Sequence, residues 1–410
     1  MIDFYAIRQE FPALQRKING RPITYLDSAA TSLKPKIVID AVEEYYKTNS
    51  SNVHRSPHTL SHEATEKYIY AHEKVAEFIG AKSWREIIFT KNATEASNLV
   101  AYSLGLHLVQ EKDRIITTIM EHHSNIVPWQ FIAKYKKAEL VFVDINDDGT
   151  LKEEQIFDLI NERTKIITIS GASNVTGYCP NLEKIIKEVK RINPEIIVIV
   201  DGAQLVPHKR VNVEKLGCDF LFASGHKMLG PSGTGFLWGK EELLEKIPPF
   251  MYGGDMISRV TIEGAEWNEL PMKFEAGTPN ISGGIGLGKA VEFLEKLIDH
   301  CEEHERKLFK LAFEELSKIP KVKLYVRPDG KEDRFIGVIS FNVEGVHPHD
   351  IADFLDKYAI EVRAGHHCAQ PLMQRLNMEN SIRVSFYIYN TEEEVLFFID
   401  VLKEAITFLT

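Results

Sequence analysis

Between about residues 60 and 240, short runs rich in β-branched residues alternate with segments of helical periodicity. Six runs have the composition of strands: "EIIFT" at 86–90, "RIITTI" at 114–119, "LVFVDI" at 140–145, "KIITIS" at 165–170, "EIIVIVD" at 195–201 and "FLFASG" at 220–225. This alternation is typical of a mostly parallel sheet with helices on its faces, so an α/β fold is predicted. Among the helices we expect "HEATEKYIYAHEKVAEFIG", with Gly80 as its C-cap.

The pattern changes after about residue 283. A long charged helical stretch over 285–317, interpreted as a solvated face, precedes a smaller unit. Its predicted strands are "VKLYV", "GVISFNV", "EVRAG" and "IRVSFY", and its closing helix is "EEEVLFFIDVLKEAITFL". A length of 410 residues also favours two domains over one core.

Charge and hydropathy narrow the functional class. The formal net charge of -10 disfavours a nucleic-acid partner, because phosphate binding relies on clustered Lys and Arg. The N-terminus has scattered charges without an apolar block, and no apolar run approaches the roughly 18 residues of a membrane span. We therefore expect a cytoplasmic protein without membrane association.

The four cysteines, at 179, 218, 301 and 368, form no C-x-x-C pair. This spacing argues against a disulfide framework and against a structural zinc site. Three of them are interpreted as small buried hydrophobic residues. Cys368 differs because it follows two histidines in "RAGHHCAQP".

A lysine and an aspartate follow two of the predicted strands. Lys227 lies in "SGHKMLGPSGTG", at the strand end where open α/β folds bind ligands. Desolvation would free its amine for Schiff-base chemistry. Asp201 ends the preceding strand in "VDGAQ", where a carboxylate suits the ring nitrogen of a pyridoxal cofactor. Alone, each has an ordinary alternative: a surface lysine and a helix cap.

Two further motifs fit the same cofactor. "FTKNATEASNLV" turns from strand to helix at Ala93 and Thr94, where a phosphate could bind with help from Ser224 and His226. A plain helix N-cap is the alternative there. In "MEHHSNIVPWQ", His122 could stack on a pyridine ring and exchange protons. A metal site of the paired histidines and Cys368 ranks lower, because one organic cofactor accounts for every motif.

Taken together, these motifs make the chain resemble a fold-type I pyridoxal-phosphate enzyme of the class V aminotransferase group, and within it a SufS-type (group II) cysteine desulfurase. The resemblance runs from "YLDSAATS" to "RVSFYIYNT", with "SNVTG" and "FEAGTPN" in the expected order. It implies a large, mostly parallel seven-stranded sheet domain and a smaller C-terminal α+β domain. The implied division is an N-terminal segment 1–20, a pyridoxal-phosphate domain 21–283 and a small domain 284–410.

The resemblance also implies roles for individual residues. Lys227 would hold pyridoxal 5'-phosphate through a Schiff base, Asp201 would pair with its ring nitrogen, and His122 would stack on the ring. Asn174 and Gln204 would contact the phenolic oxygen and the substrate. The phosphate would be held by Ala93, Thr94, Ser224 and His226, and by Thr278 of a second subunit, which implies a homodimer. Substrate would be bound by His54, Asn174, Arg363 and Arg383, with Arg55 beside His54 in an active-site loop. At the phosphate turn, the sequence "NATEA" departs from the more frequent glycine-threonine-threonine form.

The same resemblance gives Cys368 a function. Its thiolate would take sulfur from L-cysteine as a persulfide and release L-alanine, and His366, His367 and Arg363 could supply positive charge that favours the thiolate. A SufE- or SufU-type acceptor protein would then remove the sulfur for iron-sulfur cluster or other cofactor assembly. The alternatives are a selenocysteine lyase acting on L-selenocysteine, another class V enzyme such as an epimerase or transaminase, and a non-catalytic sulfur-carrier scaffold.

Overall fold

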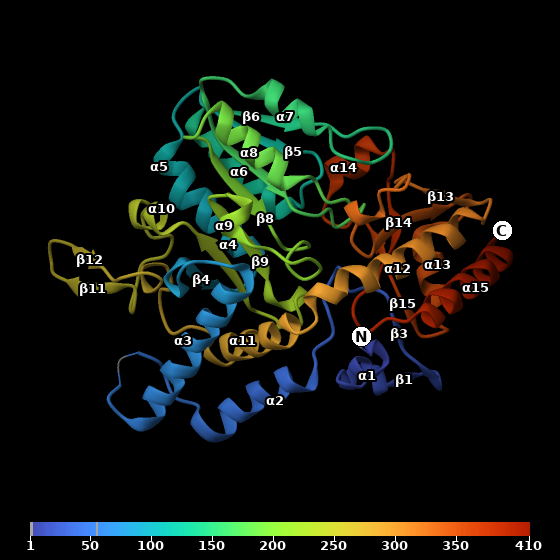
Figure 1. Cartoon of the computed structure of the whole chain (residues 1–410), viewed down its shortest axis with the longest axis horizontal. Coiled ribbons are helices and arrows are strands. Elements are labelled where there is room, and N and C mark those ends of the chain that lie inside the picture. Colours follow the sequence, from blue (N-terminus) through green and yellow to red (C-terminus); the bar gives the residue numbers. More distant parts are fainter. Residues whose placement is uncertain (1–2, 55) are drawn as a thin grey trace.

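A computed structural model describes residues 3–54 and 56–410. Its largest sheet has seven strands in the order β4-β10-β9-β8-β7-β5-β6 (Figure 1). The strands are β4 Ile87–Thr90, β5 Arg114–Thr118, β6 Glu139–Val143, β7 Thr164–Ser170, β8 Ile197–Asp201, β9 Phe220–Ser224 and β10 Gly235–Gly239. Only β10 runs against its neighbours, so the mostly parallel sheet predicted from the sequence is confirmed.

Strand β10 had no counterpart among the six predicted runs, because "GFLWG" is short and has glycine at both ends. The structure explains the first glycine. A Cβ atom on Gly235 would lie 2.7 Å from the carbonyl oxygen of Ala223 and 2.8 Å from Cα of Asn92. The strand therefore passes close to the start of α4 Ala93–Val100, the helix that follows β4, where only glycine fits.

Helices cover this sheet and extend below it. They are α2 Lys36–Glu44, α3 Thr59–Ile79, α4 Ala93–Val100, α5 Leu106–Leu108, α6 Val127–Lys136, α7 Glu153–Leu159, α8 Leu182–Ile192, α9 Val213–Leu216, α10 Glu241–Lys246 and α11 Ile281–Glu295. Helix α3 begins after His58, whose ring accepts a hydrogen bond from the Ser61 N–H, and ends at Gly80 with φ 67°. The predicted C-cap is thus confirmed.

The prediction of one long, solvated helix over 285–317 is wrong in two respects. The chain forms two helices, α11 and α12 Ile298–Ser317, with a break at 296–297. Most of α11 is buried rather than solvated, because its glycine-rich face packs between α2 and α3. Small residues on this face allow the helices to approach closely.

A second sheet lies at the other end of the molecule (Figure 1). Its order is β13-β14-β17-β16, with β13 Val322–Leu324, β14 Val338–Val343, β16 Arg363–Gly365 and β17 Ser381–Ser385. Helices α12, α13 Pro348–Asp356 and α15 Glu392–Leu409 pack beside it, and α14 Gln370–Arg375 follows β16. The four predicted strands and the closing helix are therefore confirmed, and Thr391 and Glu394 begin α15 with a capping box.

Short N-terminal elements contact this second unit. Helix α1 Phe4–Gln9 places Arg8 2.7 Å from Glu394, and β3 Thr24–Tyr25 pairs in parallel with β15 Ile360–Glu361. Two hairpins complete the fold: β1 Lys17–Ile18 with β2 Arg21–Pro22, and β11 Ile257–Val260 with β12 Ala265–Trp267. The second hairpin projects from the body of the molecule (Figure 1).

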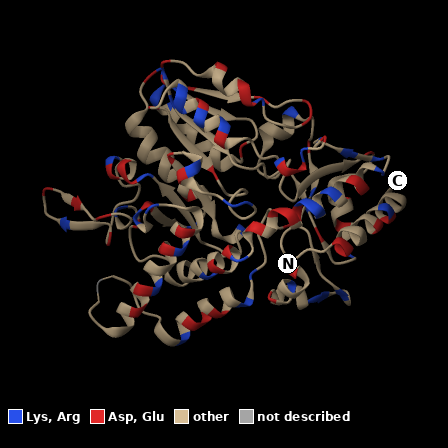
Figure 2. Cartoon of the chain, in the orientation of Figure 1, with Lys and Arg blue, Asp and Glu red and all other residues tan. Residues whose placement is uncertain are grey.

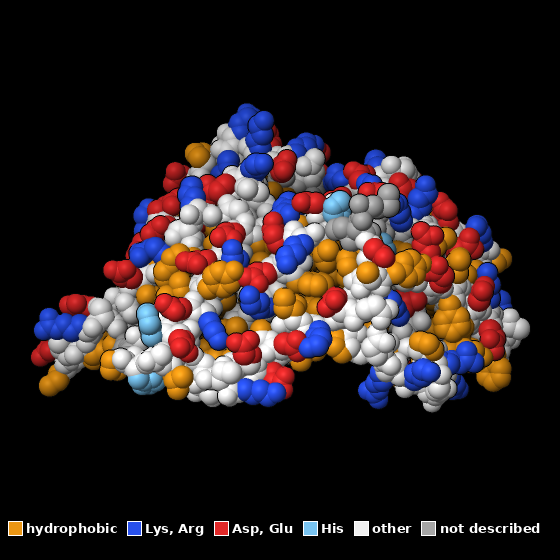
Figure 3. All heavy atoms as spheres, turned by 60° about the horizontal axis from the view of Figure 1, so that its bottom comes forward, with side chains coloured by type: hydrophobic (Ala, Val, Ile, Leu, Met, Phe, Trp, Pro, Cys, Tyr) orange, Lys and Arg blue, Asp and Glu red, His pale blue; other side chains and the backbone are white. Residues whose placement is uncertain are grey.

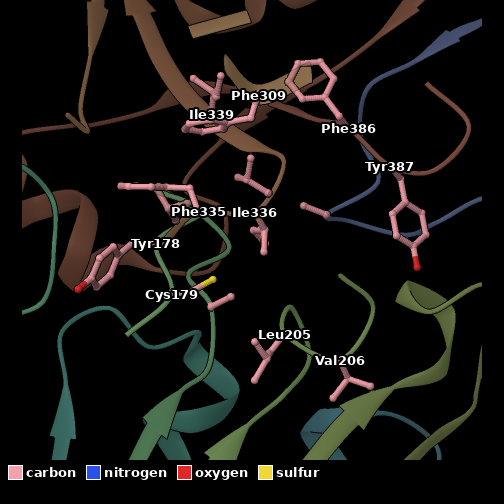
Figure 4. Close-up of a cluster of buried hydrophobic side chains, with 14 of the residues drawn as sticks. Tyr178, Cys179, Leu205, Val206, Phe309, Phe335, Ile336, Ile339, Phe386 and Tyr387 are labelled. Carbon is pink, nitrogen blue, oxygen red and sulfur yellow. The ribbon is translucent and has the colours of Figure 1, made fainter. Parts of the chain in front are cut away.

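Buried side chains join the two sheets into one hydrophobic core (Figure 4). Loops after β7 and β8 contribute Tyr178, Cys179, Leu205 and Val206. The second unit supplies the side chains that face them: Phe309, Phe335, Ile336, Ile339, Phe386 and Tyr387. Burial of each large apolar side chain stabilises the fold by about 1.5–3 kcal/mol, so this junction fixes how the two sheets are placed.

Charges of both signs are interspersed along the chain and over the face seen in the space-filling view (Figures 2 and 3). Hydrophobic side chains lie between them on that face. Within the described ranges, no helix is both long and apolar enough to cross a membrane.

Candidate active site

A cavity of about 270 Å³ lies at the carboxyl ends of the parallel strands. Loops after β5, β7, β8 and β9 meet there with the start of α4 and with the second unit. Twelve residues predicted from the sequence line it: Ala93, Thr94, His122, Asn174, Asp201, Gln204, Ser224, His226, Lys227, Arg363, Cys368 and Arg383. The fold therefore brings together side chains that are up to 290 residues apart along the chain (383 - 93 = 290).

Lys227 ends a 3-10 turn, Gly225–Lys227, that follows β9. Burial lowers the pKa of its amine to about 8, and Arg383 and Arg363 add to the effect, while Asp201 opposes it. Among the described residues, none is a hydrogen-bond or ion-pair partner of Nζ. About a tenth of the amine is thus unprotonated at pH 7, far more than for an ordinary lysine, and Schiff-base formation uses this form.

The carbonyl oxygen of His226 anchors this turn. It accepts hydrogen bonds from the Ser32 N–H at 3.0 Å, the Thr31 hydroxyl at 2.9 Å and Lys34 Nζ at 2.9 Å. Burial also lowers the pKa of Lys34 to about 8. Sequence reasoning missed Lys34, because "SLKPK" reads as a surface loop. Its position two residues after the motif "YLDSAATS" was the available signal.

Asp201, the last residue of β8, is buried at the floor of the cavity. Its Oδ1 accepts the Ala203 N–H at 2.9 Å, and burial raises the pKa of the carboxyl group. No ion-pair partner within 4 Å is seen for it in the described part of the chain. A cationic or N–H-donating ligand group would compensate this buried carboxylate. Gln204 presents a second buried acceptor for such a ligand group. Its Oε1 is buried without a partner, while its Nε2 donates to the Ala29 carbonyl.

An anion-binding corner lies at the start of α4. Asn92 caps the helix by accepting the Glu95 N–H at 2.9 Å, and the Ala93 N–H donates to Ser224 Oγ at 2.8 Å. The Ser224 hydroxyl therefore keeps its own proton for a ligand. Burial, with Lys227 and Lys34, lowers the pKa of His226 to about 4, so its neutral ring can donate one hydrogen bond. These donors fit a phosphate group.

His122 is neutral in this site. Burial, followed by the charge of Lys227, lowers its pKa to about 3. Its Nδ1 accepts the Ser124 N–H at 3.1 Å and lies 2.7 Å from the Ser124 hydroxyl. This arrangement leaves the ring proton on Nε2. The imidazole can therefore donate a hydrogen bond or stack on a ring without carrying charge.

A buried carboxyl group, Glu121, supports the His122 turn. Its oxygens accept hydrogen bonds from the hydroxyl groups of Thr118 and Ser170, the Ser170 N–H and Asn125 Nδ2, at 2.6–3.0 Å. Burial raises its pKa to about 7 despite these donors. Sequence reasoning gave Glu121 no role, and its place directly before the paired histidines was the available signal.

Arg383 is buried beside the cavity and already makes two bonds. It donates to Asp27 Oδ1 at 2.9 Å and to the Asn174 carbonyl at 3.1 Å, while its Nε is buried without a partner. The guanidinium stays charged, and its spare donor fits a substrate carboxylate. Arg363, on β16, is exposed at the same cavity, and Asn174 Nδ2 donates to the His367 carbonyl at 2.6 Å.

Cys368 is exposed, whereas Cys179, Cys218 and Cys301 are buried as predicted. It lines both the Lys227 cavity and an open groove of about 490 Å³ beside α6. Its φ of 55° follows a φ of 52° at His367, and each left-handed residue costs about 1–2 kcal/mol. The expected charge from His367 is wrong: burial lowers the pKa of that ring to about 3, and its Nε2 bonds Ser381 Oγ at 3.0 Å.

Two residues predicted for the active site, His54 and Thr278, do not line the Lys227 cavity. The His54 ring is 6.0 Å from that of Tyr68, and Thr278 lines a separate cavity of about 160 Å³ that Tyr68 also lines. Arg55 lies outside the described residues. The roles of His54 and Thr278 stay predictions, and that of Thr278 requires a second subunit. Among residues 3–54 and 56–410, no group of three or more His, Cys, Asp or Glu side chains is placed to hold a metal ion.

These residues fit pyridoxal 5'-phosphate. The free amine of Lys227 matches its aldehyde, and the buried Asp201 carboxylate, which has no ion pair, matches its ring nitrogen. The unpartnered Gln204 oxygen matches its phenolic oxygen, and the start of α4, with spare donors, matches its phosphate.

Comparisons with known proteins agree with this fit. The family model of aminotransferase class-V matches residues 24–398. A relative named "Probable cysteine desulfurase" from Halalkalibacterium halodurans is 48% identical over 392 residues, 95% of each chain. Another of that name from Synechocystis is 44% identical and covers 98% of this chain and 96% of its own length.

Two solved structures are similar along the whole chain. Apo cysteine desulfurase from Thermococcus onnurineus NA1 has a TM-score of 0.93 and 40% identity, covering 100% of this chain and 99% of its own. The cysteine desulfurase CsdA (S-sulfonic acid) from Escherichia coli has a TM-score of 0.92 and 36% identity, covering 100% of both.

The fold and the cavity define a fold-type I enzyme that uses pyridoxal 5'-phosphate. Within that class, the chain belongs to the class-V aminotransferase family.

Proposed function

We propose that this chain is a SufS-type (group II) cysteine desulfurase, which converts L-cysteine to L-alanine and transfers the sulfur to Cys368. The observation that carries the proposal is one cavity lined by both Lys227, with its lowered pKa, and the exposed Cys368. The names of the similar proteins support the same substrate.

Binding and orientation of the substrate would come from the cavity walls. Arg383 would bind the amino acid carboxylate through its unpartnered Nε, and Asp27 would hold the guanidinium in place. Asp201 and Gln204 would orient the cofactor, with Ala93, Thr94, Ser224 and His226 at its phosphate. Pyridoxal phosphate supplies an electron sink when it is bound.

Chemistry at the substrate needs a base and a nucleophile. Lys227, as free amine, would move the proton at Cα, and the neutral His122 would donate a hydrogen bond nearby. The Cys368 thiolate would attack the substrate sulfur: an S–S bond forms, the Cβ–S bond breaks, and the electron pair stays with the carbon skeleton. That skeleton takes up protons and leaves as L-alanine.

Release of the persulfide sulfur would require a thiol acceptor. Because Cys368 borders an open groove, we propose that an acceptor protein of the SufE or SufU type receives the sulfur there, for iron-sulfur cluster or other cofactor assembly. We further propose a cytoplasmic homodimer, in which Thr278 acts in the partner's site.

The test compares L-alanine and sulfide release from L-cysteine and a thiol reductant by the wild type, Cys368→Ala and Cys179→Ala. We expect Cys368→Ala to lose at least about a hundredfold in rate with its cofactor absorption intact. Cys179→Ala, which removes a buried thiol outside the cavity, should keep its rate. Undiminished release by Cys368→Ala would contradict the proposal, and faster turnover of L-selenocysteine by that variant would favour a selenocysteine lyase.

A further inference from the structure

The two adjacent histidines after β5 face different partners. The His122 ring is held by Ser124 and lines both the Lys227 cavity and the outer groove, whereas His123 lines the outer groove, together with Cys368, and not the cavity.

His123 makes two hydrogen bonds to the segment that carries the cysteine. Its backbone N–H donates to the Cys368 carbonyl at 2.8 Å. Its ring Nε2 accepts the Gln370 N–H at 3.1 Å, at the first residue of α14. One residue of the turn that follows β5 thus binds the chain on both sides of Ala369.

The cysteine segment requires such support. His367 and Cys368 have φ angles of 52° and 55°, a left-handed conformation that side chains disfavour and that glycine would adopt more easily. Within the segment, the Ala369 N–H donates to the His366 carbonyl at 3.1 Å. Asn174 Nδ2 donates to the His367 carbonyl. The strained pair is therefore held by the loop after β7, which carries Asn174, and by the turn after β5, which carries His123.

We propose that His123 is a positioning residue for Cys368, and that its ring fixes the nucleophile by accepting the Gln370 N–H. The inference rests on the proposed function of Cys368. Loss of the ring acceptor frees the Gln370 amide and lets the 366–370 segment relax away from its strained conformation. The sulfur-transfer step then slows, while substrate binding at Arg383 is unaffected.

A matched pair of amide variants separates the acceptor from other properties of the ring. In His123→Gln, the side-chain oxygen reaches the position of Nε2; in His123→Asn, which is one methylene shorter, it does not. Hydrogen exchange by mass spectrometry on the holoenzyme would follow peptides that span 366–373, with the cofactor absorption band recorded in parallel.

We expect amide exchange at Gln370 to be about tenfold faster in His123→Asn than in the wild type, as for loss of one hydrogen bond. The same variant should lower kcat with KM unchanged and with its absorption band intact. His123→Gln should restore both exchange and kcat. Wild-type exchange in His123→Asn, or equally fast exchange in both variants, would overturn the proposal.

The exchange readout is independent of the proposed function. If Cys368→Ala kept full release of sulfide, the role of Cys368 as sulfur acceptor would fail, yet the exchange data would still decide whether the His123 ring holds the segment. Conversely, unchanged exchange would remove the role of His123 and leave that of Cys368 intact.

Discussion

At the scale of single residues, burial rather than charge pairing sets the protonation states in the cavity. The pKa values of Lys227, His122 and His226 are all lowered, and desolvation is the largest cause each time. Both histidines are neutral near pH 7, so Lys227 is the group among these three whose protonation changes between pH 7 and 9. Arg383 and Arg363 keep positive charge in the cavity for an anionic substrate.

The lowered pKa of Lys227 predicts how cofactor loading depends on pH. Only the unprotonated amine of Lys227 can react covalently, so the loading rate of cofactor-free enzyme should rise about tenfold per pH unit below pH 8 and level off above it. Stopped-flow absorption would measure the rate, with Lys227→Ala as the control for non-covalent uptake. A rate that keeps rising to about pH 10.4, the ordinary lysine value, would contradict the lowered pKa.

Lys227, Asp201 and His122 could be predicted from the sequence, because each ends or follows a predicted strand. Arg363 and Arg383 lie within strands, and their roles came from the family resemblance. Lys34 and Glu121 could not be predicted, since their roles depend on packing against residues far along the chain, such as His226 for Lys34. The expected charge on His367 failed for a similar reason. Its position next to Cys368 is visible in the sequence, but its burial against Ser381 is not.

At the scale of elements, alternating composition predicted the parallel strands, and glycine obscured two features. Strand β10 was missed because glycines at both ends made it look like a loop. Helix α11 was merged with α12 because charged residues dominate the later part of that stretch, while the glycines that bury α11 carry no hydrophobic signal. In both elements, glycine allows close approach of backbones rather than chain flexibility.

Close approach at α11 can be tested with one substitution. A Cβ atom on Gly288 would lie 2.8 Å from Cβ and 2.9 Å from Cα of Ala71 on α3, so the helices must separate. We expect Gly288→Val to lower the free energy of unfolding by about 1–3 kcal/mol, measured by urea unfolding at fixed protein concentration. In Gly253→Val, whose Cβ would meet nothing within 4 Å, the change should stay within about 0.5 kcal/mol. Equal stability of the two variants would rule out tight α3–α11 packing.

At the scale of the whole molecule, the chain has two sheets, with the cavity between them. We propose the division predicted from the sequence: 1–20, 21–283 and 284–410. Contacts of Arg8 with Glu394 support the placement of the N-terminal segment against the last helix, and the four strands of the second sheet all lie after residue 321. Lys227 and Cys368 come from opposite sides of this division, so its geometry controls the distance between base and nucleophile.

Within a single chain, Thr278 does not reach the cavity where the cofactor phosphate is predicted to bind. Thr278 lines the second cavity with Tyr68, near His54, and not the cavity of Lys227. The hairpin β11–β12, near this region in sequence, projects from the body and exposes Val260 and Ile262 (Figure 1). An exposed apolar hairpin next to an unfinished site is typical of a subunit interface.

Hybrid dimers would test this assignment. If Thr278 acts on the partner's cofactor, a dimer of one Lys227→Ala chain and one Thr278→Ala chain contains one complete site: the intact Lys227 of the second chain and the intact Thr278 of the first. We expect a Thr278→Ala homodimer to bind cofactor about tenfold more weakly, through loss of a charge-assisted hydrogen bond. Co-expressed, doubly tagged hybrids should recover tight covalent loading at one site per dimer, measured by mass spectrometry after borohydride reduction. If Thr278 instead acts within its own chain, the hybrid has no complete site, and its loading stays as weak as that of the Thr278→Ala homodimer.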